Sequence, residues 1–454
     1  MAYDYLDVSG GEGPLYLKLY RSLKTAMETG KLKHGERLPS IRRFCEDLGV
    51  SRTTVEAAYQ QLCVEGYLKS EPKKGYFVRS GESHTLPEQH RPVPVPILLA
   101  AKYRYNLGTD CVDAENVDLT VWRRHVREAL NRHESVVSYG DHQGEPELRE
   151  ALSRYAARTR GLSVTPGEVV VGAGSQPLLS LLCGLAGKKR VGIDERGFAQ
   201  AEQIFRDFGM DIVPLPCDEN GLDPAALHKS GVDLAYISPS SPVKSGSAMP
   251  TSRRFELIRW AQERDGVLVE DDYNGELRYR ARPIPAMRGM AGGSRVAYLG
   301  SFSKLLLPSV RIGYMVLPPE LLERYRMRAR NYNQTASKIE QLALADYITS
   351  GQMERRLRRL RKLYATKSQA MGKCLSDIFP GIPFVLEETA LYFRMPVQEE
   401  EANHLCGLAA EQGVRVRPRQ DGKGLSLALS FSGIALPDIP EAVRLLGLAW
   451  NKKG

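Results

Sequence analysis

Hydrophobic residues near the N-terminus recur at the spacing of a helix. Apolar side chains follow one another every four residues from Leu15 to Met27, which predicts an amphipathic helix that ends at Gly30. A second helix is expected after Ser40. Ser51 stands where it would cap a third, because a serine hydroxyl there accepts a hydrogen bond from the first helical turn. Two short helices joined by a turn that contains glycine are typical of a helix-turn-helix.

Two short runs after these helices have the composition of strands. Residues 66–69 and 75–78 both combine glycine with aromatic and aliphatic residues, and the turn-forming segment 71–74 lies between them. We predict a small β-hairpin, or wing, beside the helices. Together the helices and the wing form a predicted unit over residues 1–80.

Residues 81–104 carry neither a helical nor a strand pattern. Pro87, Pro92, Pro94 and Pro96 are mixed there with polar residues. Such a segment favours extended polyproline II, which rises about 3.1 Å per residue. We therefore expect a linker that separates the two flanking units.

From residue 105 to residue 454, short apolar runs alternate with helical segments. The runs are 169–171, 234–237, 267–269 and 295–299. This alternation predicts a mainly parallel α/β sheet with crossover helices.

The composition narrows the class of protein without identifying a function. Of the 454 residues, 42% are hydrophobic and 26% are charged, which is the balance of a globular chain. The longest apolar stretch, 177–186, is too short to cross a membrane, and the first residues lack the pattern of a signal peptide, so we expect a cytoplasmic protein. The seven cysteines are scattered without a CxxC pair, which argues against a disulfide framework and a metal site. The net charge of +9 permits contact with a polyanion.

Short polar side chains and one arginine begin the third predicted helix. Ser51, Arg52, Thr53 and Thr54 occupy the turn where a helix-turn-helix places side chains that meet base edges and phosphates. A dimerisation or docking unit with solvated basic residues explains the same pattern, so both alternatives stand at this point. Flanking residues that would contact the DNA backbone are Arg42, Arg43, Lys74, Gly75 and Tyr76.

The N-terminal unit resembles the winged helix of the GntR family over nearly all of residues 12–79. The resemblance rests on the runs 38–43, 49–55, 66–68 and 75–78. It implies sequence-specific binding of double-stranded DNA as a dimer. The residues that it implies on DNA are Arg42, Arg43, Ser51, Arg52, Thr53, Thr54 and the wing near Gly75.

The large unit carries reactive side chains at the predicted ends of its strands. Lys304 follows the strand 295–299, and open α/β sheets bind ligands beyond the carboxyl ends of their strands. Ser301 and Ser303 flank this lysine, and Arg311 follows a few residues later. Hydroxyl groups and an arginine suit a dianionic phosphate.

Two further strands end in polar residues. Residues 172–176 close one strand and open a helix, so Ser175 and backbone amides would face the same phosphate. Asp271 and Tyr273 end another strand and offer a carboxylate and a phenol to the ring of a Schiff-base cofactor. Singly, these features also fit a surface lysine, an ordinary turn or a magnesium site. Their placement at the ends of separate strands favours a single site.

Residues 105–447 resemble the fold-type I aminotransferases, which bind pyridoxal 5'-phosphate. The resemblance follows the segments 139–149, 174–176, 301–304 and 311–313. It implies that Lys304 forms the Schiff base, that Asp271 pairs with the pyridinium nitrogen and that Tyr273 binds the 3-oxygen. Other implied cofactor contacts are Ser175, Gln176, Ser301, Ser303 and Arg311 on the phosphate, Phe198 stacked on the ring, and Tyr139 from the partner subunit.

Three positions depart from the aminotransferase pattern. Pro242 stands where the family has an Asn or Gln that bonds the 3-oxygen, and Arg196 replaces a proline before the segment of Phe198. Ala428 replaces the arginine that grips a substrate carboxylate. These changes affect substrate handling more than cofactor binding. The nearest candidates to replace the missing arginine are Arg415, Arg417 and Arg419.

A winged helix joined to such a domain resembles the MocR/GabR subfamily of GntR regulators. We favour a homodimeric transcriptional regulator whose DNA binding responds to pyridoxal phosphate at Lys304, alone or with a small amine or amino-acid effector. An aminotransferase with an appended DNA-binding unit is the first alternative. A dimerisation scaffold without a cofactor, suggested by Pro242, is the second. The basic segment 355–362 is predicted to be a solvated helix face or, alternatively, an additional DNA contact.

Overall fold

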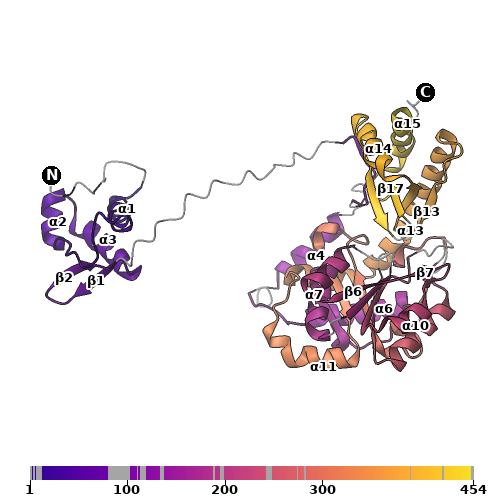
Figure 1. The fold of residues 1–454 in the computed structure, drawn as a ribbon, viewed down its shortest axis with the longest axis horizontal. Helices are drawn as coiled ribbons and strands as arrows, with labels where there is room; N and C mark the ends of the chain where they lie inside the picture. The colour runs from indigo at the N-terminus through magenta and orange to yellow at the C-terminus, as the bar shows by residue number, and fades with distance from the viewer. Residues whose placement is uncertain are drawn as a thin grey trace. The chain divides into compact units, whose positions relative to one another are not determined.

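The structure is a computed structural model that divides into two compact units, Met1–Ala100 and Ala101–Gly454 (Figure 1). Most of the predicted linker 81–104 lies outside the described residues. The residues that the structure describes are 3, 6, 13–79, 103–109, 111–112, 119–132, 137–187, 190–194, 199–241, 248–272, 275–280, 283–388, 390–421 and 424–450.

The small unit contains the predicted helices and wing. Its elements are α1 (Leu15–Glu28), α2 (Ile41–Leu48), α3 (Arg52–Val64), β1 (Leu68–Glu71) and β2 (Gly75–Val78). The Ser40 and Ser51 hydroxyls accept hydrogen bonds from the amides of Arg43 and Thr54, as N-caps do. Strand β1 begins two residues later than expected, because the amides of Gly66 and Tyr67 bond back to α3 and close that helix.

A seven-stranded sheet forms the centre of the large unit, in the order β4-β12-β11-β10-β9-β5-β6. All neighbouring strands are parallel except β12, which is antiparallel to both β4 and β11. The mainly parallel sheet is therefore confirmed. The strands are β4 (Val169–Gly172), β5 (Arg190–Asp194), β6 (Asp211–Leu215), β9 (Leu234–Ile237), β10 (Val267–Asp272), β11 (Val296–Ser301) and β12 (Gly313–Val316).

Helices cover both faces of this sheet, which is why its strands are nearly continuous apolar runs. On β10, Val267 and Val269 pack into one core and Leu268 into another. The first core is closed by α7 (Ser175–Ala186), α8 (Ala199–Asp207) and α11 (Pro319–Arg328). The second is closed by α9 (Pro224–Ser230) and α10 (Thr251–Glu263), and a third contains α4 (Leu119–Leu130), α6 (Pro146–Arg160) and α12 (Lys338–Thr349).

A second, antiparallel sheet near the C-terminus was not predicted. Its order is β13-β14-β17-β16, and one of its faces packs on α13, α14 and α15. The elements are β13 (Val385–Glu387), β14 (Tyr392–Pro396), β16 (Arg417–Asp421), β17 (Gly424–Ser430), α13 (Gln352–Ile378), α14 (Glu399–Glu411) and α15 (Ile439–Trp450). Short pairs β3 (Tyr105–Asn106) with β15 (Val414–Arg415), and β7 (Cys217–Asp218) with β8 (Gly221–Leu222), complete the strands of the described residues.

Two expectations from composition can be compared with the structure. All seven cysteines are free, but only Cys183 and Cys217 are buried and the others are half-buried. Within the described ranges, no helix combines the length and the apolar character that crossing a membrane requires.

The basic segment 355–362 lies on α13. Leu357 and Leu360 of this segment are buried, while Arg355 and Lys362 face solvent.

The strand directions bring the predicted site residues to one edge of the large sheet. Strands β4, β10 and β11 run the same way and end at Gly172, Asp272 and Ser301. Gly313, which starts β12, pairs with both Gly172 and Ser301. Residues just beyond these ends therefore gather at the same edge.

Candidate functional site

The N-terminal turn of α3 presents a group of exposed polar side chains. The Ser51 hydroxyl caps the helix and lies 2.9 Å from the Thr53 hydroxyl and 2.8 Å from the Thr54 hydroxyl. Arg52 is 79% exposed and its Nε donates to Glu56 across 2.7 Å. The hydroxyls are held in place by one another, and the rest of the guanidinium remains open to a ligand.

Arg42 and Arg43 lie on the exposed side of α2, each with an acid one turn later. Arg42 Nε is 3.0 Å from Glu46 and Arg43 Nε is 3.6 Å from Asp47. Exposed pairs of this kind contribute little free energy, about 0–1 kcal/mol. A DNA phosphate can therefore replace the acids at small cost.

The tip of the wing combines a lysine with a constrained glycine. Lys74 is exposed and lies 3.4 Å from Glu71. Gly75 has a φ of +113°, and a Cβ there would lie 3.3 Å from Nε of Arg37. The Tyr76 ring packs edge-on against Tyr59 at 4.8 Å, so this ring also supports the base of the wing.

Arg37 was missed by the sequence analysis. Its backbone forms a bridge with Phe77 of the wing, and its side chain is exposed beside Gly75. It lies outside the helices, so no helical period singled it out. Only the folded wing brings this charge beside Gly75, the residue that follows Lys74.

The predicted phosphate site gathers where β4, β11 and β12 meet. Ser175 is the first residue of α7, just after β4, and Ser301 ends β11. The Ser301 and Ser303 hydroxyls are 3.2 Å apart. Gln176 is exposed at the same helix start. These side chains and the free amides of α7 form a polar edge with positive helix-dipole character.

Arg311 lies directly over the start of α7. A Cβ on Gly174 would be 3.1 Å from Arg311 Nη2 and Gly174 has a φ of +90°, so a side chain there would push the guanidinium back and strain the backbone. Arg311 itself has a φ of +52°, a left-handed conformation that is uncommon for a residue other than glycine. Within the described residues its guanidinium has no ion pair, which leaves it available to an anion.

Asp271 lies on β10, between β9 and β11. The Tyr236 hydroxyl of β9 donates a hydrogen bond to its carboxylate. Burial raises the pKa of Asp271 to about 6, while this hydrogen bond lowers it and the neighbouring Asp272 raises it. The carboxylate is thus charged above about pH 6 and is ready to pair with a cationic ring nitrogen.

Lys304 is 5% exposed and follows β11, as predicted. Its Nζ donates to the backbone carbonyls of Thr109 and Cys111 at 2.6 and 2.7 Å, and to the Ser432 hydroxyl at 3.3 Å. These partners come from two distant segments, so sequence spacing gave no signal for them. The amine must leave these oxygens before it can react with a carbonyl carbon.

Tyr139 is fully exposed, and among the described residues no hydrogen bond or ring contact holds its phenol. The loop around it is nevertheless fixed, because Lys338 Nζ donates to the Ser138 hydroxyl at 2.8 Å and Glu145 accepts from the Asp141 amide at 3.3 Å. The structure thus presents this phenol to solvent on a well-held loop.

Four residues that the sequence analysis discussed for the cofactor site lie outside the described residues, namely Tyr273, Phe198, Pro242 and Arg196.

Ala428, where the aminotransferase pattern has an arginine, has arginines on both sides. It pairs with Arg417 of β16 and with Arg394 of β14. Arg415 lies instead on β15, opposite Asn106, and Arg419 is opposite Ser426. Of the three predicted replacements, Arg417 is therefore the one directly beside Ala428. Arg394 was not predicted, and its Nε is 3.3 Å from Glu387.

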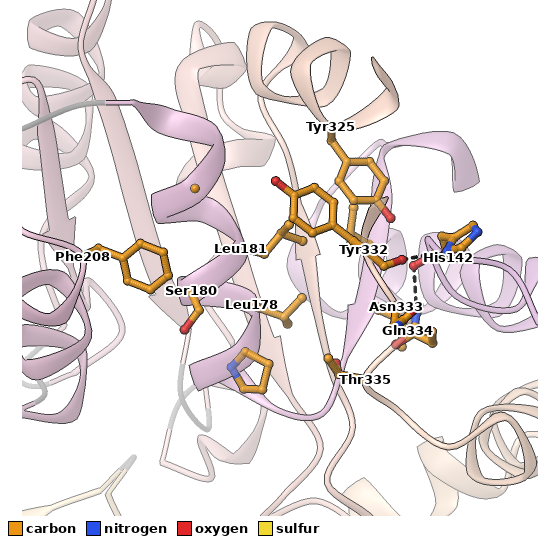
Figure 2. A pocket seen from close by; sticks show the side chains of 14 residues that line it. His142, Leu178, Ser180, Leu181, Phe208, Tyr325, Tyr332, Asn333, Gln334 and Thr335 are labelled. Atoms are coloured by element: carbon orange, nitrogen blue, oxygen red, sulfur yellow. Dashed lines mark hydrogen bonds between the residues drawn. The ribbon is translucent and has the colours of Figure 1, made fainter. Parts of the chain in front are cut away.

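A hollow of about 450 Å³ lies beside α7 (Figure 2). Leu178 and Leu181 of α7 line it together with Phe208 and the stacked rings of Tyr325 and Tyr332. None of the predicted cofactor contacts lines it. His142 bonds to the Tyr332 carbonyl at 2.7 Å, which ties the loop of Tyr139 to the wall of the hollow.

One cluster of potential metal ligands lies between α4 and α12. Ligand atoms of His125, Glu128 and Asp346 lie within 4.8 Å of one another. However, Asp346 accepts from Arg132 at 2.7 Å, and Glu128 is 3.3 Å from His125 Nδ1. Asp346 is thus already paired with Arg132, while His125 and Glu128 lie one turn apart on α4 itself.

Comparison with known protein families gives two matches along the chain. Residues 106–443 match the family "Aminotransferase class I and II", and residues 15–78 match "Bacterial regulatory proteins, gntR family". Each range lies within one of the two parts of the chain that the sequence patterns separate.

Relatives that are similar over most of the chain are transcriptional regulators by name. The uncharacterized HTH-type transcriptional regulator YhdI of Bacillus subtilis is 35% identical, with 96% of each chain covered. The probable rhizopine catabolism regulatory protein MocR of Rhizobium meliloti is 32% identical, with 78% of this chain and 76% of MocR covered. The pyridoxine biosynthesis transcriptional regulator PdxR of Corynebacterium glutamicum is also 32% identical, with 80% of this chain and 79% of PdxR covered.

Solved structures similar to the large unit are aminotransferases. The α-aminoadipate aminotransferase LysN of Thermus thermophilus, complexed with N-(5'-phosphopyridoxyl)-L-leucine, has a TM-score of 0.67 at 26% identity, covering 76% of this chain and 92% of LysN. An archaeal alanine:glyoxylate aminotransferase has a TM-score of 0.69 at 24% identity, covering 77% of this chain and 91% of the aminotransferase. The aminotransferase-like fold is confirmed, and pyridoxal phosphate is the cofactor that it implies.

The side chains at the edge of the large sheet fit this cofactor. A buried lysine amine, a half-buried carboxylate and an arginine without an ion pair in the described ranges match the cofactor's aldehyde, pyridine nitrogen and phosphate. The glycine at 174 leaves space between Arg311 and the start of α7 that a side chain would narrow.

Proposed function

The chain belongs to the MocR-type subfamily of GntR transcriptional regulators, and from this premise we propose that pyridoxal phosphate held at Lys304 modulates the binding of the winged helix to an operator. The cofactor acts alone or together with a small amine or amino-acid effector. The observation that carries the proposal is the convergence of Lys304, Asp271 and Arg311 at one sheet edge in a chain with a DNA-binding unit. A protein that binds operators works at the chromosome, so we place it in the cytoplasm.

Each side chain of the site has a defined part in this proposal. When bound, the cofactor supplies an aldehyde that condenses with primary amines. Lys304 holds that aldehyde until a competing amine takes its place, and Asp271 keeps a proton on the ring nitrogen. Tyr273 and Phe198 are proposed on the 3-oxygen and the ring face. The phosphate is bound by the amides of α7 with Ser175, Gln176, Ser301, Ser303 and Arg311.

We further propose that the protein works as a homodimer in which Tyr139 completes the partner's site. The phenol is fully exposed on a fixed loop, and the apolar hollow beside α7 lies next to that loop. A second copy would cover both features. Tyr139→Ala should then lower cofactor affinity without removing Lys304.

Mixed dimers test the shared site. Chains with Tyr139→Ala should weaken cofactor binding and chains with Lys304→Ala should abolish covalent binding. A mixture of the two should regain one intact site per heterodimer, made of Lys304 from one chain and Tyr139 from the other. In heterodimers purified from the mixture, an absorbance titration should show wild-type affinity in half of the sites, since each heterodimer has one complete site and one that lacks both residues. No recovery in demonstrated heterodimers would contradict the shared site.

Regulation requires that the effector binds two states of the protein with different affinity. Coupling between two sites is reciprocal. If the effector changes the affinity for operator DNA by some factor, then operator DNA must change the affinity for the effector by the same factor. Operator binding should be measured with and without cofactor and a panel of amines, for wild type and for Lys304→Ala. An operator affinity that no cofactor or amine changes would contradict the proposal. Sustained turnover of a keto acid would support the aminotransferase alternative.

In the DNA-binding unit, Arg52→Ala should reduce specific operator binding by about 1–3 kcal/mol if Arg52 reads a base edge. Arg42→Ala is the matched control, because a phosphate contact should weaken binding to every sequence alike and reduce its salt dependence. Fluorescence anisotropy with operator and scrambled DNA at several salt concentrations distinguishes the two. Equal effects of both variants on operator and scrambled DNA would remove Arg52 from the base-reading residues.

A further inference from the structure

A network of buried charges lies on the reverse face of the strand that carries Asp271. Successive residues of a strand point to opposite faces, so Asp272 points away from Asp271. Asp272 is buried and accepts a hydrogen bond from the Tyr298 hydroxyl of β11 at 2.7 Å. The charges of this network are not part of the cofactor contacts, but they hold the same strand end.

Arg160, the last residue of α6, is the cation of this network. It is 1% exposed and forms an ion pair with Asp272. Its Nη2 also donates to the Ser240 hydroxyl at 3.0 Å, and its carbonyl accepts from the Ala286 amide at 2.9 Å. One guanidinium thus joins the end of β10 to the segment that follows β9.

A second buried arginine closes the same segment. Arg254 of α10 is fully buried and donates to the carbonyls of Pro239 and Met249, both at 3.0 Å. Arg160 and Arg254 thus bind neighbouring residues, Ser240 and Pro239, of the segment that follows β9.

Stability alone does not explain such an arrangement. A buried ion pair costs so much desolvation that apolar residues of similar volume are often equally stable. Here the cost is compounded, because Glu270 and Glu276 are also buried, and burial raises the pKa of each to about 7. What the pair does provide is fixed geometry between strand ends, since a guanidinium fork accepts its partners in only a few orientations.

We propose that Arg160 is a positioning residue of the cofactor site, which fixes Asp271 at the end of β10 through the ion pair with the neighbouring Asp272. This inference rests on the proposed binding of pyridoxal phosphate. Removal of the guanidinium leaves Asp272 without its ion pair and breaks the link to Ser240. The end of β10, and Asp271 with it, then loses its fixed position in the proposed site.

Three variants test this role against a control. Arg160→Met removes the fork, Arg160→Lys keeps the charge, and Arg160→Met with Asp272→Asn removes both charges of the pair. Arg253→Met is the control, because Arg253 is also largely buried and bonded to Asp218 at 2.7 Å, but its partners are Asp218, Glu256 and the Leu222 carbonyl rather than residues of β10. Pyridoxal phosphate is titrated by absorbance well below each variant's unfolding temperature. The wavelength of the visible absorption maximum is measured as a function of pH.

The expected result is a loss of cofactor affinity of about tenfold to a hundredfold in Arg160→Met. This is the range known for the loss of side chains that hydrogen-bond to the ligands of a metal ion. The midpoint of the spectral pH profile should shift as well. Arg160→Lys should recover only part of the affinity. The double variant should fold well but remain weak in cofactor binding, because it lacks the link between strands. Arg253→Met should lower the unfolding temperature alone.

The results that would contradict this inference differ from those that would contradict the proposed function. Wild-type affinity and an unchanged pH profile in Arg160→Met would overturn the inference. If that variant does not fold, wild-type affinity in the double variant would overturn it instead. Wild-type protein that takes up no pyridoxal phosphate would contradict the proposed function itself, and this inference with it.

Discussion

Lys304→Ala abolishes covalent retention of the cofactor, which is the largest effect we expect from a single substitution. No other amine among the predicted site residues can replace it, and the hydrogen bonds from Lys304 to Thr109, Cys111 and Ser432 are lost with it. Purified wild type should show a visible absorption band from the bound cofactor. The variant should lack this band and lose all pyridoxal phosphate on gel filtration. Its winged helix should still bind DNA but no longer respond to amines.

Two controls separate chemistry from folding in that experiment. Lys304→Arg keeps a cation near the three oxygens but cannot form a Schiff base, so it should also be colourless. Lys362→Ala removes an exposed lysine of α13 and should retain the band. A band of wild-type intensity in Lys304→Ala would show that another amine binds the cofactor.

Asp271→Ala should produce the second largest effect. Loss of one partner from a buried charge pair costs about 2–5 kcal/mol, and each 1.4 kcal/mol is about tenfold in affinity. We therefore expect pyridoxal phosphate to bind at least about thirtyfold more weakly. Absorbance titration or equilibrium dialysis measures this loss, and Asp271→Asn serves as the isosteric variant.

The same carboxylate predicts a pH dependence. Because burial raises the pKa of Asp271 to about 6, the free site has its charge above that pH and loses it as the pH falls through that value. Wild-type cofactor affinity should fall correspondingly on acidification. The hydrogen bond from Tyr236 lowers the pKa, so Tyr236→Phe should move the midpoint to higher pH. Asp271→Asn should lack this transition; if it keeps the wild-type profile, another group is responsible.

Local sequence signals predicted the DNA-binding unit in most of its detail. Serine caps, glycine stops and a four-residue apolar period act within a few residues of chain, so Ser40, Gly49 and Ser51 could be assigned before folding. The start of the wing was two residues early, because the glycine at 66 completes the end of α3. The expected roles of Arg42, Arg52 and Lys74 on DNA remain predictions.

Apolar runs predicted four strands of the large sheet, β4, β9, β10 and β11. The strand 234–237 has the predicted bounds, and β4, β10 and β11 end at the same edge of the sheet. The C-terminal sheet was missed because Arg394 interrupts the apolar residues of β14 and because β16 is largely polar.

Tertiary contacts account for the other omissions in the site. The oxygens that bind Lys304 come from residues near 110 and from Ser432, and Arg160 reaches Asp272 across more than a hundred residues of sequence. No period or motif encodes such pairs. The family resemblance implied the direct cofactor contacts, but the side chains that position them became visible only in the folded chain.

The most direct test is chemical. Wild-type protein is incubated with pyridoxal phosphate, reduced with borohydride and digested, and the peptides are analysed by mass spectrometry. A phosphopyridoxyl group on Lys304, formed in wild type and prevented by an amine that also changes operator affinity, is the predicted outcome. Reduction that leaves Lys304 unmodified in protein that still binds its operator would contradict a regulatory role for the cofactor at this site.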